Sequence, residues 1–230
     1  MTGVFCFTGS GHSLRVAEYI AEKLNSRVCM IDSKKPASAE ELQSAVVVFP
    51  VYCQNIPQPV KDFLKKLRTE NAALIATYGK ISCGNVLAEA KGLVRGRVIA
   101  GACVPIGHTF LNGSADFDHT ALEPLFERIE NPREAIIPTK RKSIFADFLP
   151  DWRSRLSVKI IRAGSCIGCN VCGQSCPMGA IKNGTTNNKC IRCLRCVASC
   201  PQKALSFKNS FVLQKYLSKK REEKAVELYL

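Results

Sequence analysis

Short apolar runs alternate with segments of helical periodicity along the first 130 residues. The apolar runs are rich in β-branched or aromatic residues, as expected of buried strands. Between them, apolar residues recur at the spacing of an amphipathic helix, as Leu14, Ala17, Ile20 and Leu24 do. The predicted strands are residues 4–7, 28–31, 45–49, 73–77 and 98–104.

Strands that alternate with helices form βαβ units, so the fold class is α/β: a doubly wound, five-stranded parallel sheet with helices on both faces. After a last helical pattern near residues 122–129, three prolines (Pro132, Pro138 and Pro150) interrupt the periodicity. We therefore expect a first domain at residues 1–130, a linker at 131–160, a small cysteine-rich α+β domain at 161–208 and a C-terminal helix at 209–230.

The composition is that of a globular protein. Of 230 residues, 46% are hydrophobic and 23% charged, which excludes a wholly disordered chain. The longest apolar run, residues 45–53, is too short to span a bilayer and contains Pro50. The first residues show no basic region followed by an apolar stretch and a cleavage site. We expect a cytoplasmic protein.

The number and placement of the cysteines restrict the possible functions of the chain more than any other residue type does. The chain has 13 cysteines, and eight of them lie between residues 166 and 200. Where thiols are kept reduced, such a cluster indicates metal ligation rather than disulfides. Among the others, Cys6, Cys29 and Cys103 fall in predicted strands and are expected to be small core residues, whereas Cys53 and Cys83 fall in loops.

The eight clustered cysteines form two copies of one motif, C-x2-C-x2-C-x3-C-P, offset by 24 residues. Three cysteines in one tight loop reach three corners of a cubane, and the fourth, directed away before the proline, ligates the other cluster. Two four-cysteine zinc sites are the alternative, although zinc needs no third regularly spaced cysteine. The cubane assignment gives one cluster Cys166, Cys169, Cys172 and Cys200, and the other Cys190, Cys193, Cys196 and Cys176. This segment resembles bacterial-type ferredoxins with two [4Fe-4S] clusters.

A second candidate site follows the first predicted strand. Glycines, hydroxyl groups and a helix amino terminus together provide donors for a phosphate. The loop lacks the third glycine of G-x-G-x-x-G, because Leu14 stands there, and the chain has no G-x-x-x-x-G-K-[ST] motif. A dinucleotide or nucleoside triphosphate is therefore disfavoured. The loop residues are Thr8, Gly9, Ser10, Gly11, His12 and Ser13.

The spacing T-x-S-G-x-S resembles the phosphate loop of flavodoxins, which holds the phosphate of FMN. In the flavodoxin order 2-1-3-4-5, ligands bind outside the carboxyl ends of the strands. Two further loops fall at that edge, and each offers a tyrosine to cover a flat ring. The candidate ring residues are Val51, Tyr52, Cys53, Gln54 and Asn55 after the third strand, Thr77, Tyr78 and Gly79 after the fourth, and Asn85 just beyond.

Over residues 1 to about 208, the chain resembles the fused flavodoxin–ferredoxin electron-transfer proteins of anaerobic bacteria and archaea. The phrases FTGSGHSLRVAE, FPVYCQNIPQPVKDFLKKL and ATYGKISCGN precede the double cysteine motif in the family's order. The resemblance implies one FMN, two [4Fe-4S] clusters and electron transfer between them. The chain departs from the family at His12, where asparagine is common, and at Gln54 and Asn55, where glycines are common. Side chains there either tune the flavin or exclude it.

Charge bears on the partner. The net charge is +14, and residues 151–230 carry 15 Lys and Arg against 4 Asp and Glu. Thiolate-bound clusters offset part of this excess, and the rest favours acidic redox proteins such as a ferredoxin-like donor or acceptor. On this hypothesis we expect no nucleic-acid partner and no membrane-spanning segment. Two alternatives are a flavin-dependent reductase fed by reduced ferredoxin and a basic iron–sulfur or zinc protein that binds nucleic acid.

Overall fold

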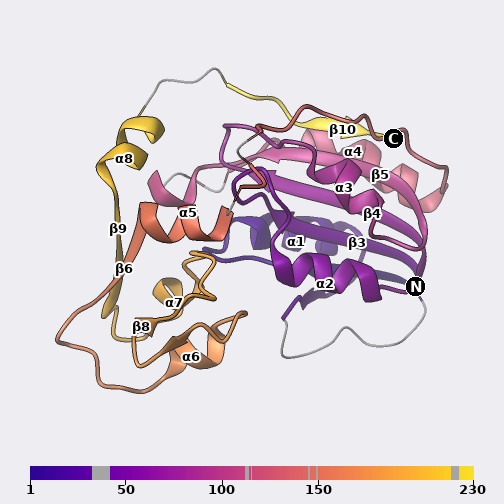
Figure 1. Cartoon of the computed structure of the whole chain (residues 1–230). Helices are drawn as coiled ribbons and strands as arrows, with labels where there is room; N and C mark the ends of the chain where they lie inside the picture. Colours follow the sequence, from indigo (N-terminus) through magenta and orange to yellow (C-terminus); the bar gives the residue numbers. More distant parts are fainter. Residues whose placement is uncertain (33–41, 112–113, 115, 145, 149, 219–222) are drawn as a thin grey trace.

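The structure is a computed structural model of the chain and describes residues 1–32, 42–111, 114, 116–144, 146–148, 150–218 and 223–230. Figure 1 shows a twisted sheet covered by helices, with the cysteine-rich module beside one end of the strands. None of the helices in these ranges is long and apolar enough to cross a membrane.

The sheet has the strand order β10-β5-β4-β3-β1-β2, and its five N-terminal strands pair in parallel. This confirms the doubly wound α/β class and the order 2-1-3-4-5. The strands are β1 (Thr2–Cys6), β2 (Val28–Met30), β3 (Leu42–Pro50), β4 (Thr69–Tyr78), β5 (Arg97–Pro105) and β10 (Glu227–Tyr229).

The central strands are apolar on both faces because helices cover both. Alternate residues of β3 enter different cores, Val47 and Phe49 one and Val46 and Val48 the other. The first core lies under α2 (Gln58–Lys66) and α3 (Val86–Lys91), and the second under α1 (His12–Lys23) and α4 (Glu123–Glu130), which follows the short turn η2 (Thr120–Leu122). Because helices cover both faces of the centre of β3, residues 45–49 form one continuous apolar run.

The C-terminal segment differs from expectation. Helix α8 covers only Phe211–Leu217, and Glu227–Tyr229 form β10, which pairs antiparallel with β5. The apolar positions that suggest helical spacing here, such as Leu228, instead pack against the core beside β5. A sheet edge with unpaired backbone groups favours strand formation over local helical preference. The chain thus returns from the cysteine-rich module to the first domain (Figure 1).

The cysteine-rich module is a small α+β unit whose two halves repeat. Strand β6 (Val158–Arg162) pairs antiparallel with β9 (Leu205–Asn209), and β7 (Ile181–Lys182) with β8 (Thr185–Thr186). Helices α6 (Val171–Ser175) and α7 (Arg195–Ala198) hold equivalent places in the two motif copies. Ser175 and Ser199, 24 residues apart, share a hydroxyl hydrogen bond of 2.8 Å between the halves. The module begins with β6, three residues earlier than expected, and α5 (Pro150–Ser157) precedes it.

Strand β10 is expected to stabilise the sheet edge. A chain that ends at Lys224 loses the β10–β5 pairing and the burial of Leu228, so its free energy of unfolding should fall by about 2 kcal/mol. Urea denaturation followed by circular dichroism measures the change. Removal of Leu230 alone, which lies beyond the paired residues, is the control and should change stability little. Equal stability of the two truncated chains would contradict a stabilising role for β10.

Candidate metal centre and flavin loops

Four cysteines of the module line one cavity. They are Cys176, Cys190, Cys193 and Cys196, and the rest of the wall is mostly apolar, with Ile160, Met178, Ile181, Ile191 and Leu194 among its residues. This set joins three cysteines of the second motif copy to the fourth cysteine of the first. The structure therefore brings together the crossed group that the spacing predicts for one cluster.

The backbone around this cavity repeats in both copies. Gly168 and Asn170 have positive φ angles of 73° and 56°, and Arg192 and Leu194, their equivalents 24 residues later, have 56° and 63°. A left-handed conformation is unfavourable for a residue such as leucine and persists where surrounding structure imposes it. Both loops thus curl in the same way at equivalent positions of the two motif copies.

Burial makes these thiols hard to ionise without a metal. Desolvation raises the pKa of Cys193 to about 11 and that of Cys196 to about 12, and neighbouring cysteines of the group add to both shifts. Iron supplies the positive charge that stabilises thiolates in such a setting. The Ala180 N–H also donates to Cys176 Sγ at 3.2 Å, a type of hydrogen bond that tunes cluster potentials. The residues present fit an iron–sulfur cluster at this cavity.

The other predicted ligand set is less closely gathered. Cys172 is buried, Cys200 and Cys166 are half-buried, and Cys169 is exposed. A hydrogen bond from the Gly168 N–H, together with Arg162, lowers the pKa of Cys166. Within the described ranges, no three His, Cys, Asp or Glu side chains converge closely enough to be ligands of a single ion, and this includes the four cysteines that line the cavity. The ligand sets of both clusters therefore stay predictions from the motif, and the shared cavity supports one of them.

The second cysteine loop packs directly on the carboxyl edge of the parallel sheet. Arg195 donates two hydrogen bonds to the Thr8 carbonyl, from Nε at 2.9 Å and Nη2 at 2.6 Å, and its guanidinium lies 5.1 Å from the centre of the Phe7 ring. Gly9 lies so close to the Cys193 carbonyl oxygen that any side chain at Gly9 would collide with it. The metal-binding loop thus covers the start of the predicted phosphate loop.

The phosphate-loop side chains are bonded within the chain. The Thr8 hydroxyl accepts the Gly11 N–H at 3.1 Å, and Gly11, with a φ angle of 97°, caps α1. Hydroxyl groups pair between Ser10 and Thr109 and between Ser13 and Thr77, and His12 Nδ1 lies 3.0 Å from the Gly107 carbonyl oxygen. These side chains are thus bonded to neighbouring strands and turns.

The linker packs on the loops predicted to hold the flavin ring. The Gln54 Oε1 atom accepts the Ser143 N–H at 2.8 Å, the Asn55 amide donates to the Ala146 carbonyl at 2.7 Å, and Asn85 Oδ1 accepts the Lys140 N–H at 2.9 Å. The Lys142 ammonium, on a side chain only 13% exposed, contacts Asn55, Glu89 and Asp147 at 2.6–2.9 Å. Gln54 and Asn55, where the family commonly has glycines, therefore bind the linker.

The two candidate stacking tyrosines are also engaged. Tyr52 packs in the first core, and burial raises its pKa well above the usual value. Tyr78 is only 5% exposed in the same core, and Gly79 packs against the ring of His108. Of the other ring candidates, Val51 donates its N–H to Thr77, and Cys53 is exposed beside Ser154. In this arrangement the linker and the second cysteine loop contact several of the residues predicted to hold the ring and the phosphate of FMN, so binding of FMN there would compete with these contacts.

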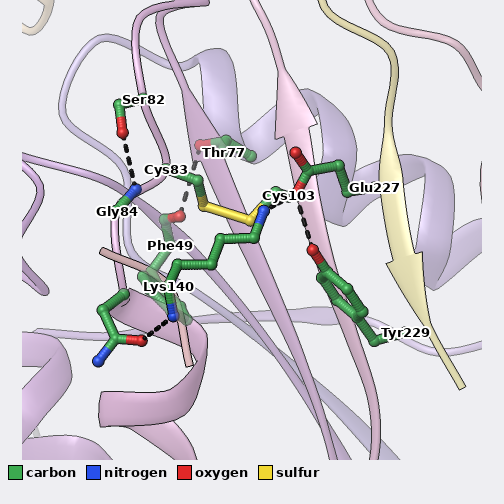
Figure 2. The surroundings of a disulfide bond; sticks show 10 residues. Phe49, Thr77, Ser82, Cys83, Gly84, Cys103, Lys140, Glu227 and Tyr229 are labelled. Carbon is green, nitrogen blue, oxygen red and sulfur yellow. Dashed lines mark hydrogen bonds and ion pairs between the residues drawn. A yellow bond between two sulfur atoms is a disulfide. The ribbon is translucent and has the colours of Figure 1, made fainter. Parts of the chain in front are cut away.

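Two scattered cysteines form a disulfide that the sequence did not predict. Cys83, in the loop after β4, is bonded to Cys103 of β5 (Figure 2). Cys103 is buried in the core, as expected, but it is bonded to Cys83 rather than packed as a free thiol. Cys29, also expected in the core, is exposed. A separation of 20 residues between two cysteines carries no recognisable motif. Only the βαβ connection, which returns Cys103 to the strand beside β4, brings the two thiols together.

Comparison with known families supports the metal-binding assignment. Residues 159–182 and 186–206 match the family of 4Fe-4S binding domains. The chain therefore contains a 4Fe-4S binding domain, and the matched ranges hold all eight clustered cysteines. No curated protein matches this chain.

Two solved structures from Bacteroides, both described as flavoproteins, are similar to the chain. The Bacteroides uniformis protein shares 16% identity with a TM-score of 0.36, covering 48% of this chain and 93% of its own. The Bacteroides eggerthii protein shares 14% identity with a TM-score of 0.41, covering 56% of this chain and 97% of its own. Similarity this distant says nothing about which ligand this chain binds.

The linker contacts predict how FMN binding responds to mutation. Replacing Gln54 and Asn55 with glycine removes two of the bonds that hold the linker backbone and the Asn55 bond to Lys142, each worth about 1 kcal/mol. We expect weak FMN binding by the wild-type chain and binding at least about tenfold tighter by the double variant. Gln54 has a φ of 62°, a conformation that glycine adopts readily, so the variant should fold.

Titration with FMN, followed by flavin fluorescence, measures both affinities. Gln58→Ala is the matched control, because Gln58 bonds Asp62 within α2 and leaves the linker unchanged. Purification of the wild-type chain with one tightly bound FMN per chain would show that the linker does not exclude flavin.

Proposed function

We propose that this chain is an electron-transfer protein whose redox centres are two [4Fe-4S] clusters in the module that starts at β6. The observation that supports this most is the cavity lined by Cys176, Cys190, Cys193 and Cys196. Ligands from both motif copies meet there, which is the pattern of a two-cluster ferredoxin. The second cluster would take Cys166, Cys169, Cys172 and Cys200.

When bound, the clusters supply one-electron redox chemistry. The cluster that Cys176, Cys190, Cys193 and Cys196 would hold, the second-copy cluster, would be surrounded by mostly apolar residues, and an N–H donor lies beside Cys176. Burial and N–H···S hydrogen bonds are the levers by which a protein sets cluster potentials. Arg195 fixes the metal-binding loop against Thr8 and places a positive charge beside the thiolates.

The exposed first-copy loop is the proposed entry point for electrons. Cys169 and Ile167 are exposed, so a cluster held there would lie near the protein surface. The second-copy cluster would be the interior one, because Cys193 lies against Gly9 of the first domain. Electrons would pass from a protein partner to the exposed cluster and then to the interior one. Cys193, a predicted ligand of the interior cluster, lies against Gly9 at the edge where a flavodoxin-like domain binds its flavin.

FMN stays a prediction of the family resemblance. Its candidate residues are the phosphate loop and the loops after β3 and β4, and binding there requires the linker to leave Gln54, Asn55 and Asn85. We derive no electron-transfer step through FMN.

The ligand assignment predicts the metal content of variants. Wild-type chain purified without oxygen should contain about eight iron and eight acid-labile sulfide, and Cys193→Ala should contain about half as much. Cys29→Ala is the matched control, because Cys29 is an exposed cysteine outside the module and should leave the iron content unchanged. Full iron content in Cys193→Ala would disprove the assignment, and zinc without sulfide in the wild type would show structural zinc sites.

The charge of the module predicts how its partner binds. With 15 basic against 4 acidic residues in 151–230, association with an acidic redox protein should be steered electrostatically. The second-order rate of electron exchange with an acidic ferredoxin should fall roughly tenfold between low and high salt. Stopped-flow absorbance measures the rate, and an uncharged small-molecule donor, whose rate should change little, is the control. A salt-independent rate with salt-sensitive binding to DNA would favour the nucleic-acid alternative.

A further inference from the structure

The Cys83–Cys103 disulfide is buried in the same core that the predicted metal centre adjoins. Its cysteines are 6% and 1% exposed, in the first core under α2 and α3. The same core includes Cys193, which lines the four-cysteine cavity described above, and Ile191 of the same loop. Packed protein therefore joins the disulfide to the metal-binding loop.

We propose that this disulfide is an internal two-electron acceptor, reduced by electrons that arrive singly through the iron–sulfur module. The inference rests on the proposed function. In the reaction, the S–S bond breaks, and two electrons and two protons convert it to the Cys83 and Cys103 thiols. Two one-electron oxidations of reduced clusters supply the electrons.

The cysteine content of the chain favours a redox role for this disulfide over a purely structural one. Eight cysteines of the same chain must stay reduced to ligate iron, so the protein works where thiols persist. Disulfides in such surroundings are generally transient and take part in catalysis or redox sensing. A crosslink between Cys83 and Cys103 under these conditions is therefore one that is made and broken.

Burial favours electron transfer over thiol exchange. Exchange requires a thiolate to approach a sulfur atom in line with the S–S bond. Both cysteines are nearly inaccessible, and Pro138, Lys140 and Tyr229 lie around the small cavity beside Cys103. This low exposure disfavours the approach of a partner thiol, whereas electron transfer through packed protein needs no such approach.

Protons can reach the site from the side of β10. Glu227 is the register partner of Cys103, and its carboxylate contacts the Lys140 ammonium and accepts the Tyr229 hydroxyl at 2.8 Å. Figure 2 shows these three side chains grouped beside the disulfide. Lys140 is one-third exposed, so an ammonium that gives a proton to a new thiolate regains one from water.

The test counts electrons and thiols on the same anaerobic holoprotein. The chain is reduced in steps with dithionite, quenched in acid and alkylated with N-ethylmaleimide, and the Cys83 and Cys103 peptides are identified by mass spectrometry. We expect no label on either cysteine before reduction and label on both afterwards. The double variant Cys83→Ser, Cys103→Ser should accept about two fewer electrons per chain, with an unchanged cluster absorbance spectrum.

Cys193→Ala tests the route. With one cluster lost, the rate of thiol formation at Cys83 and Cys103 should fall at least about tenfold relative to Cys29→Ala. An unchanged rate would overturn delivery through the cluster. Label on both cysteines before reduction would overturn the acceptor role, and so would an intact crosslink after full reduction of the clusters. Both measurements use the wild-type chain and so do not depend on the folding of a variant. Absence of iron from the wild-type chain would instead overturn the proposed function, and the route with it.

Discussion

The rest of the structure depends on how the second cysteine loop packs on the carboxyl edge of the sheet. Arg195 binds the Thr8 carbonyl twice, and Cys193 lies against Gly9, which has no side chain to obstruct it. A parallel sheet leaves the carbonyl groups that end its strands facing this edge, so a guanidinium with several donors suits it. The edge that would bind a free cofactor therefore binds a covalently attached domain.

The linker and the disulfide both follow from this arrangement. Gly84, next to Cys83, packs against the Gln54 side chain, and Asn85 holds the backbone of Lys140. The disulfide thus fixes the loop on which the linker rests. The disulfide and the linker therefore both contact the few residues after β4.

A common physical arrangement underlies these features. The 4Fe-4S binding domain is a small basic module, and the Cys83–Cys103 disulfide lies in the core of the larger domain. The flavodoxin-like sheet gives this module a rigid face, since helices cover both sides of its central strands. Strand β10 then returns the end of the chain to that sheet, beside Cys103.

The sequence by itself determined the local features. Apolar periodicity predicted the five parallel strands and the α/β class, because period and burial are properties of neighbouring residues. The double motif predicted the crossed ligand group of Cys176 with Cys190, Cys193 and Cys196, since cubane geometry restricts the spacing of its ligands. The sequence also marked Gln54 and Asn55 as departures, without showing what they bind.

Only the tertiary structure decided the contacts between distant segments. The occupation of the flavin loops by the linker, the Cys83–Cys103 disulfide and the strand at Glu227–Tyr229 each join residues that no local pattern relates. Strand formation at the C-terminus depends on an open sheet edge, and the disulfide depends on the return of β5 beside β4. Long-range contacts depend on how the whole chain packs, and for this reason they cannot be derived from the spacing of residues alone.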